Sequence, residues 1–243
     1  MTARKPITHH FASSTHRPNE HVAVRFKRHK NWLELNWSDY YRTAEAVGLG
    51  LNYLGLKRGE RVALLANTCW EWAACDFAIL GLGAVTVPIY QSHRSDEVEF
   101  ALTHTQCRFL ILEDQSQWRK WEAIAKRCPF VEKIIVLRPF EDMPAELLTW
   151  DDLCKKGADL SADGIFFHQS CLQTQLTDLA TIVFTSGTSY VIPSGVTTIT
   201  YAKAIGGGGG GANTKSGAGG GEYRRKNSIT VTPLATVSMR IGA

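Results

Sequence analysis

A run of three hydroxyl residues around one glycine is the segment of this sequence best suited to chemistry. Thr185, Ser186, Gly187 and Thr188 follow directly after the apolar stretch 180–184, which has the composition of a β-strand. Strand ends in open α/β sheets are where ligands bind, and here hydroxyl and amide groups could donate hydrogen bonds to phosphate oxygens while the glycine allows a close backbone approach. No Walker sequence G-x-x-x-x-G-K-[ST] is present. The residues by themselves therefore leave two interpretations open, an anion-binding loop and a purely structural turn.

Strands and helices alternate along the part of the chain that must position this loop. Apolar runs typical of strands buried on both faces occur at 62–66, 84–88, 108–112 and 133–137. Helical patterns of about ten residues lie between them, the last at 115–127. This alternation predicts an α/β fold with a parallel, doubly wound sheet and helices on both faces.

A hairpin and a helix are predicted before the first of these strands. The β-prone runs 21–27 and 32–37 flank a short polar turn. Ser38 is expected to cap the helix that follows, and Gly55 to end it. Thr68 is expected to begin the next helix in a capping box.

Composition and cysteine spacing exclude several classes of protein. The chain has 243 residues, of which 44% are hydrophobic and 21% charged, ordinary values for a globular chain. No apolar run is long enough to span a membrane, and the first residues lack the apolar core of a secretory signal. The six cysteines form no C-x-x-C pair, so the sequence predicts neither a metal site nor a disulfide framework. We therefore expect a cytoplasmic protein.

The net charge of +4 is concentrated at the C-terminal end. Residues 1–196 carry 21 Lys and Arg against 22 Asp and Glu, whereas residues 197–243 carry 6 against 1 and also hold 11 of the 21 glycines. Because the patterned part is almost neutral, the basic pI does not argue for nucleic-acid binding. We predict a folded domain over 1–196 and a Gly-rich, basic, disordered tail over 197–243, with disorder centred on 203–228 and a short β-prone run at 229–232.

Phe184 and the four residues after it resemble the phosphate-binding loop of the adenylate-forming, AMP-dependent synthetase/ligase family, whose usual form is an aromatic residue followed by T-S-G-T-T-G-x-P-K-G. The resemblance covers residues 22–188 in family order, and it is carried by the blocks GLKRGERVALL, WEW, GAVTVPIY and DLATIVFTSGT. The block VPIYQS looks most like the long-chain fatty acyl-CoA synthetase branch. The chain is thus similar to the N-terminal part of an acyl-CoA ligase.

This resemblance implies an activity, cofactors and partners. A carboxylic acid, here a fatty acid, would be activated with ATP and Mg²⁺ to an acyl-adenylate, and the thiol of coenzyme A would then displace AMP. Thr185, Ser186, Gly187 and Thr188 would hold the β- and γ-phosphates, and none of them would act as a nucleophile. The resemblance implies small-molecule partners, no nucleic acid and no specific protein partner, and it leaves peripheral contact with a membrane open.

The sequence departs from the family pattern directly after Thr188. Tyr190 stands at the position of a glycine and Ser194 at that of the lysine, with one residue inserted. The family motifs Y-G-x-T-E and T-G-D do not occur. We therefore expect the first part of an enzyme, inactive by itself. Three alternatives stay open: a fragment of another adenylating enzyme, a catalytically dead product that retains only the sheet scaffold, and a frameshift or assembly error in the altered tail.

Overall fold

The protein is described by a computed structural model that covers residues 4–160, 165–184, 189–191, 198–205, 223–230 and 236–238. The chain divides into two compact units, Met1–Val183 and Phe184–Ala243. The division that composition predicts, at residue 196, lies outside the described residues.

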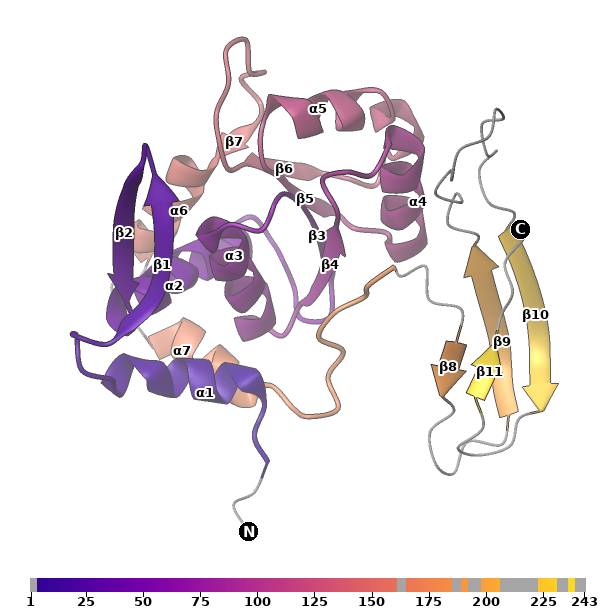
Figure 1. Ribbon diagram of the computed structural model, residues 1–243, viewed down its shortest axis with the longest axis horizontal. Helices are drawn as coiled ribbons and strands as arrows, with labels where there is room; N and C mark the ends of the chain where they lie inside the picture. The colour runs from indigo at the N-terminus through magenta and orange to yellow at the C-terminus, as the bar shows by residue number, and fades with distance from the viewer. Residues whose placement is uncertain are drawn as a thin grey trace. The chain divides into compact units, whose positions relative to one another are not determined.

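A parallel sheet forms the centre of the first unit (Figure 1). Its strands lie in the order β4-β3-β5-β6-β7, and every neighbouring pair is parallel. The sheet strands are β3 (Arg61–Leu65), β4 (Val85–Ile89), β5 (Phe109–Leu112), β6 (Lys133–Val136) and β7 (Leu148–Thr149). The predicted parallel α/β sheet is confirmed, with strand bounds that differ from the predicted ones by one residue.

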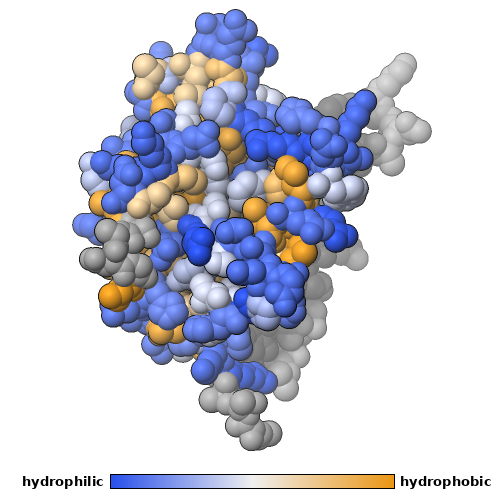
Figure 2. Space-filling view, turned by 90° about the vertical axis from the view of Figure 1, so that its left-hand side faces the viewer, coloured by the Kyte–Doolittle hydropathy of each residue, from blue (hydrophilic) through white to orange (hydrophobic). Residues whose placement is uncertain are grey.

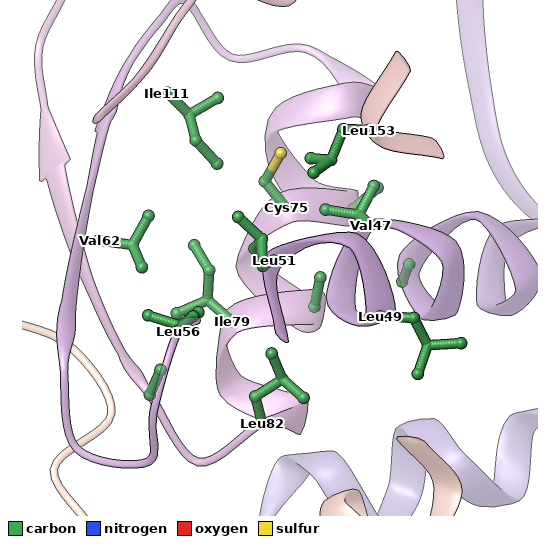
Figure 3. Packing of buried hydrophobic residues seen from close by; sticks show 14 of the residues in the cluster. Val47, Leu49, Leu51, Leu56, Val62, Cys75, Ile79, Leu82, Ile111 and Leu153 are labelled. Atoms are coloured by element: carbon green, nitrogen blue, oxygen red, sulfur yellow. The ribbon is translucent and has the colours of Figure 1, made fainter. Parts of the chain in front are cut away.

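Helices cover both faces of this sheet (Figure 1). One face packs against α2 and α3, and Figure 3 shows Val62 and Ile111 of the strands directed toward Ile79 of α3 and Leu51 of α2. Side chains of a strand alternate between faces, so Ala63, which is also fully buried, belongs to the opposite face. The helices are α1 (Ile7–Ser13), α2 (Trp37–Tyr53), α3 (Trp70–Gly81), α4 (Ser95–Thr105), α5 (Gln115–Glu122), α6 (Trp150–Leu160) and α7 (Ile165–Gln173). Among the described residues, none of these helices is long and apolar enough to cross a membrane.

The predicted hairpin is present as β1 (Val22–Arg28) paired antiparallel with β2 (Asn31–Asn36). His29 and Lys30 form its two-residue turn with φ of 48° and 70°, as a type I′ turn requires. Phe26 stacks on Trp70 of α3 with ring centroids 5.4 Å apart, which holds one face of the hairpin to the core. Figure 2 views the molecule from the side of this hairpin, and most of that face is hydrophilic.

Two predicted helix caps are wrong by one or two positions. Asn36, not Ser38, caps α2, because its side chain accepts a hydrogen bond from the backbone of Asp39 at 2.8 Å. Cys69, not Thr68, precedes α3 and accepts from the backbone of Trp72 through Sγ at 3.4 Å. Both residues have extended backbone, which lets the side chain fold back onto the first turn.

The predicted end of α2 at Gly55 is confirmed. Gly55 has φ of 91° and donates to the carbonyl of Asn52 at 2.9 Å, while Leu56 donates to the carbonyl of Leu51 at 3.0 Å. This is the Schellman arrangement, which needs a left-handed residue after the helix. The helix predicted at 115–127 is shorter, because α5 ends at Glu122 and a separate 3₁₀ turn spans Ala125–Arg127.

The second unit contains two antiparallel strand pairs. β9 (Thr198–Ile205) pairs with β10 (Tyr223–Thr230), and β8 (Ser189–Val191) pairs with β11 (Thr236–Ser238). The predicted disorder at 203–228 falls mainly on 206–222, outside the described residues. At its two ends, residues 203–205 and 223–228 belong to the β9–β10 pair.

Candidate functional site

The chain approaches the predicted loop along the outer edge of β4. Thr86 of β4 donates its backbone N–H to the carbonyl of Ala180 at 3.0 Å and accepts from Ile182 at 3.0 Å. The hydroxyl of Thr181 also donates to the carbonyl of Thr86 at 3.0 Å. This pairing is parallel, so residues 180–182 run in the same direction as β4, toward the carboxyl edge of the sheet.

The predicted strand at 180–184 is reduced to this single bridge at Thr181. Val183 is 46% exposed, and Ala180 and Thr181 are exposed as well, although an apolar strand was expected to be buried. In the described part of the chain β4 is the neighbour of this segment on one side, and no strand pairs with its other side. The segment is therefore an edge of the sheet held by one bridge rather than a buried strand.

Arg58 holds the start of this segment. Its guanidinium forms an ion pair with Asp178 and also donates to the carbonyl of Gln173 at 3.2 Å. The same carboxylate accepts from the backbone of Gln175 at 2.9 Å. These bonds join the loop before β3 to a segment more than a hundred residues later, so no local pattern in the sequence could have predicted them.

Helix α1 contacts the segment from its other end. The hydroxyls of Thr8 and Thr174 are hydrogen-bonded to each other, and both residues are buried. Nε2 of His9 lies 3.1 Å from the carbonyl oxygen of Thr174. His9 thus has a packing role in a helix, where the sequence indicated only a polar N-terminal stretch.

A buried carboxylate ties three strand ends together at the carboxyl edge of the sheet. Glu113, which follows β5 and is 1% exposed, accepts two hydrogen bonds at 2.7 Å from the backbone and side chain of Asn67, which lies just past the end of β3. Its other oxygen lies 2.6 Å from Nη1 of Arg138, just after β6. Both oxygens are therefore partnered, and Glu113 holds the edge in place. Sequence reasoning missed this network, because the three residues are dispersed over the connections that follow three different strands.

The loop after β4 is held against α5 at the same edge. The ammonium of Lys120 donates to the carbonyl of Gln91, and burial lowers the pKa of Lys120 from its usual value. Asp114 caps α5 by accepting from the backbone of Ser116 at 2.9 Å and of Gln117 at 3.3 Å. These contacts order the loops that border the carboxyl edge.

The cysteines of the first unit are protonated at neutral pH. Burial raises the pKa of Cys69 and Cys107 to about 11 and that of Cys171 to about 12. A thiolate is the form that attacks electrophiles or binds metals, so these thiols are packing groups. Within the described part of the chain, no three His, Cys, Asp or Glu side chains gather as a metal site would require.

Thr185, Ser186, Gly187 and Thr188 lie outside the described residues. Their assignment as phosphate-contacting residues stays a prediction. What the structure does describe is the sheet, the hydrogen bonds along its carboxyl edge, and residues 180–182, which pair with β4 and shortly precede Thr185 in the sequence.

A comparison with protein families identifies the chain. The sequence model of the family described as AMP-binding enzyme matches residues 11–189. The chain belongs to this family. The predicted resemblance to adenylate-forming ligases is therefore confirmed.

Relatives within this AMP-binding family include curated acyl-CoA ligases. The chain is 30% identical over 158 residues to the long-chain-fatty-acid–CoA ligase FadD15 of Mycobacterium bovis, which covers 65% of this chain and 25% of the relative. It is 27% identical over 188 residues to the long-chain-fatty-acid–CoA ligase ACSBG2 of Mus musculus, with 76% of this chain and 28% of the relative covered. The chain therefore spans about a quarter of the length of these relatives.

A solved structure has the same fold. The anthranilate CoA ligase AuaEII in complex with anthranoyl-AMP superposes with a TM-score of 0.55 at 26% identity, over 61% of this chain and 27% of that one. The fold of the first unit is thus shared with a solved member of the adenylate-forming ligases.

Proposed function

We propose that this chain forms the N-terminal, sheet-bearing part of an ATP-dependent, AMP-forming ligase that activates a long-chain fatty acid to its coenzyme A thioester. The observation that carries the proposal is the parallel pairing of residues 180–182 with β4, in the segment that immediately precedes T-S-G-T in the sequence. The proposal that the substrate is a long-chain fatty acid is supported by the two curated relatives, which are both named long-chain-fatty-acid–CoA ligases.

The reaction has two steps. A carboxylate oxygen bonds to the α-phosphorus of ATP, and the bond from that phosphorus to the bridging oxygen breaks, so that pyrophosphate leaves. The coenzyme A sulfur then bonds to the acyl carbon, its proton is lost, and AMP leaves. In this proposal Thr185, Ser186 and Thr188 donate hydrogen bonds to the β- and γ-phosphates, and Gly187 allows their close approach to the backbone. Mg²⁺ supplies neutralising charge to the phosphates when it is bound.

A second candidate is another adenylating enzyme, one that activates an aryl acid. The likeness to a ligase named for anthranilate, at 26% identity, favours it over other acids. A catalytically dead scaffold is the third candidate, because Tyr190 and Ser194 replace the family glycine and lysine. Loss of that lysine would remove a charge-assisted contact to phosphate.

A graft tests whether the chain serves as the first part of such an enzyme. Residues 22–188 replace the matching region of the mycobacterial relative, and pyrophosphate release is followed with palmitate, ATP and Mg²⁺. The graft is expected to retain activity. A graft with Thr188→Ala is expected to react about 10²–10³-fold more slowly, which is the usual loss when an enzyme is deprived of one hydrogen-bond donor to developing charge. A folded graft without activity would leave the dead scaffold as the better account.

The identity of the acid that is activated depends on the residues after Thr188. Reading the coding sequence across codons 188–243 in all three frames separates an error from divergence, because T-G-x-P-K-G in another frame would identify a frameshift or assembly error. The product of that restored frame is then assayed with palmitate and with anthranilate. Pyrophosphate release with anthranilate alone would replace the fatty acid by an aryl acid, and absence of the motif from every frame would indicate real divergence.

A further inference from the structure

The tip of the β1–β2 hairpin presents an indole ring and a group of cations to solvent. Trp32 is 65% exposed and Leu33 42% exposed. Lys27 lies directly opposite Trp32 in the strand register, and its Nζ is 5.9 Å from the centroid of the indole ring. An exposed tryptophan beside a lysine on a two-stranded ribbon is not needed for packing, since the core contacts of the hairpin come from its other face.

That other face is held to the core. Phe26 stacks on Trp70, and Val24 and Leu35 pack against the buried cluster of the first unit. Side chains alternate along a strand, so Lys27 and Trp32 lie on the outer face. The hairpin that carries the tip is thus packed against the core through its inner face.

The charge of the tip has one sign. On the outer face Arg25 pairs with Glu34 at 2.5 Å. Lys27 follows on the same face, whereas Arg28 alternates to the face of Phe26 at the end of β1 and Lys30 lies in the turn. All three cations are on exposed residues. Residues 27–33 contain no acidic side chain. The result is a local charge of +3 around the exposed indole in a first unit whose net charge is near zero.

This combination fits a membrane surface better than a protein partner. The face seen in Figure 2 is mostly hydrophilic, whereas a stable protein interface needs a broad apolar centre. Tryptophan prefers the headgroup level of a bilayer, and nearby lysine and arginine are attracted to anionic headgroups. Lysine and arginine can also lay their apolar stems along the surface while the charge stays in water.

We propose that the tip of the β1–β2 hairpin docks on anionic lipid surfaces. Trp32 enters the headgroup region, and Lys27, Arg28 and Lys30 contact lipid phosphates and carboxylates. This inference does not depend on the proposed ligase activity, because it rests on a surface of the first unit that the predicted phosphate loop does not include.

Sedimentation with vesicles tests the proposal with the full 243-residue chain. Wild type is expected to bind vesicles of phosphatidylcholine with phosphatidylserine, to bind pure phosphatidylcholine weakly, and to lose affinity as salt is raised. The variant Lys27→Gln/Arg28→Gln/Lys30→Gln should bind on the order of 100-fold more weakly at low salt, at about fivefold for each cation removed. Trp32→Ala should weaken binding several-fold at both low and high salt, and Glu34→Gln should strengthen it about fivefold. The strengthening by Glu34→Gln is a result that loss of folding could not produce.

The basic C-terminal end supplies the matched control. Arg224→Gln/Arg225→Gln/Lys226→Gln removes the same charge outside the hairpin and should weaken binding much less than the hairpin variant. Equal binding by the hairpin variant and wild type would overturn the proposal, as would loss of binding only in the C-terminal variant. Hairpin-dependent binding to a single-stranded oligonucleotide without binding to vesicles would also overturn it, in favour of a nucleic-acid contact.

Discussion

Phe167 closes the contact between three helices, and its removal should destabilise the first unit strongly. The side chain is fully buried on α7, and its ring meets that of Tyr41 on α2 at 5.8 Å between centroids. Gly48 of α2 and Gly81 of α3 face the same ring. A Cβ placed on these glycines would lie 2.6 Å and 2.5 Å from ring carbons of Phe167. The two glycines therefore leave the space that the ring fills.

Phe167→Ala should lower the free energy of unfolding by about 3–5 kcal/mol, the usual cost of replacing a buried phenylalanine by alanine. Because domains are stable by roughly 5–15 kcal/mol, this is a large share of the total. At about 2–4 °C per kcal/mol for a domain of this size, the Tm should fall by roughly 6–20 °C. Phe166→Ala is the matched control on the same helix, since Phe166 is 52% exposed, and it should change stability by less than about 0.5 kcal/mol. Urea unfolding followed by circular dichroism measures both.

A second substitution checks the geometry independently. Gly48→Ala should destabilise the wild type by about 1–3 kcal/mol, because the new methyl group meets the Phe167 ring. In the Phe167→Ala background the same change should stabilise by up to about 1 kcal/mol, since alanine is the better residue inside α2. Equal effects of Gly48→Ala in both backgrounds, or a Phe167→Ala cost below about 1 kcal/mol, would refute the packing described for this ring.

Three further predictions concern the sheet edge, the thiols and the nucleotide. Glu113→Ala should cost about 2–3 kcal/mol in urea unfolding, because the backbone N–H of Asn67 loses its buried acceptor and the exposed Arg138 loses its ion pair. A cost below about 0.5 kcal/mol would contradict the role given to Glu113. Burial raises the pKa of Cys107 to about 11, so the stability that its neutral thiol contributes is complete below about pH 8.5 and is lost as pH rises toward 11. Between pH 8 and pH 10.5, Cys107→Ala should therefore lose about 1–2 kcal/mol less stability than wild type, and identical pH profiles would show that the thiol does not titrate with unfolding. ATP should bind the chain no more tightly than the millimolar range, about −4 kcal/mol, because Tyr190 and Ser194 replace glycine and lysine; calorimetry that gives a micromolar Kd would show that the loop still binds phosphate.

The central sheet could be predicted from the sequence because its signal is local. Strands buried on both faces read as continuous apolar runs, and 62–66 and 108–112 correspond to β3 and β5 within one residue. The stop at Gly55 is equally local, since a left-handed residue after a helix favours glycine. The family was also predictable, because the blocks that resemble it lie within this patterned stretch.

The sequence was less decisive where several residues of suitable type stand together. Either Asn36 or Ser38 can cap α2, and the choice depends on where β2 ends and the chain turns into the helix. The apolar run at 180–184 has the composition of a strand, yet it forms one bridge at Thr181, because strand formation depends on neighbours that composition does not reveal. The phosphate-binding role of Thr185–Thr188 stays a prediction from the motif.

Only the tertiary structure decided which distant polar residues meet. Arg58 pairs with Asp178 across 120 positions of the chain, and Glu113 accepts from Asn67 across 46. Such partners share no period or spacing, because they are brought together by the crossovers of the parallel sheet rather than by the helix or strand that each one borders. Residue type and periodicity determine which elements form, whereas the contacts that anchor the loops of the carboxyl edge exist only once those elements have packed.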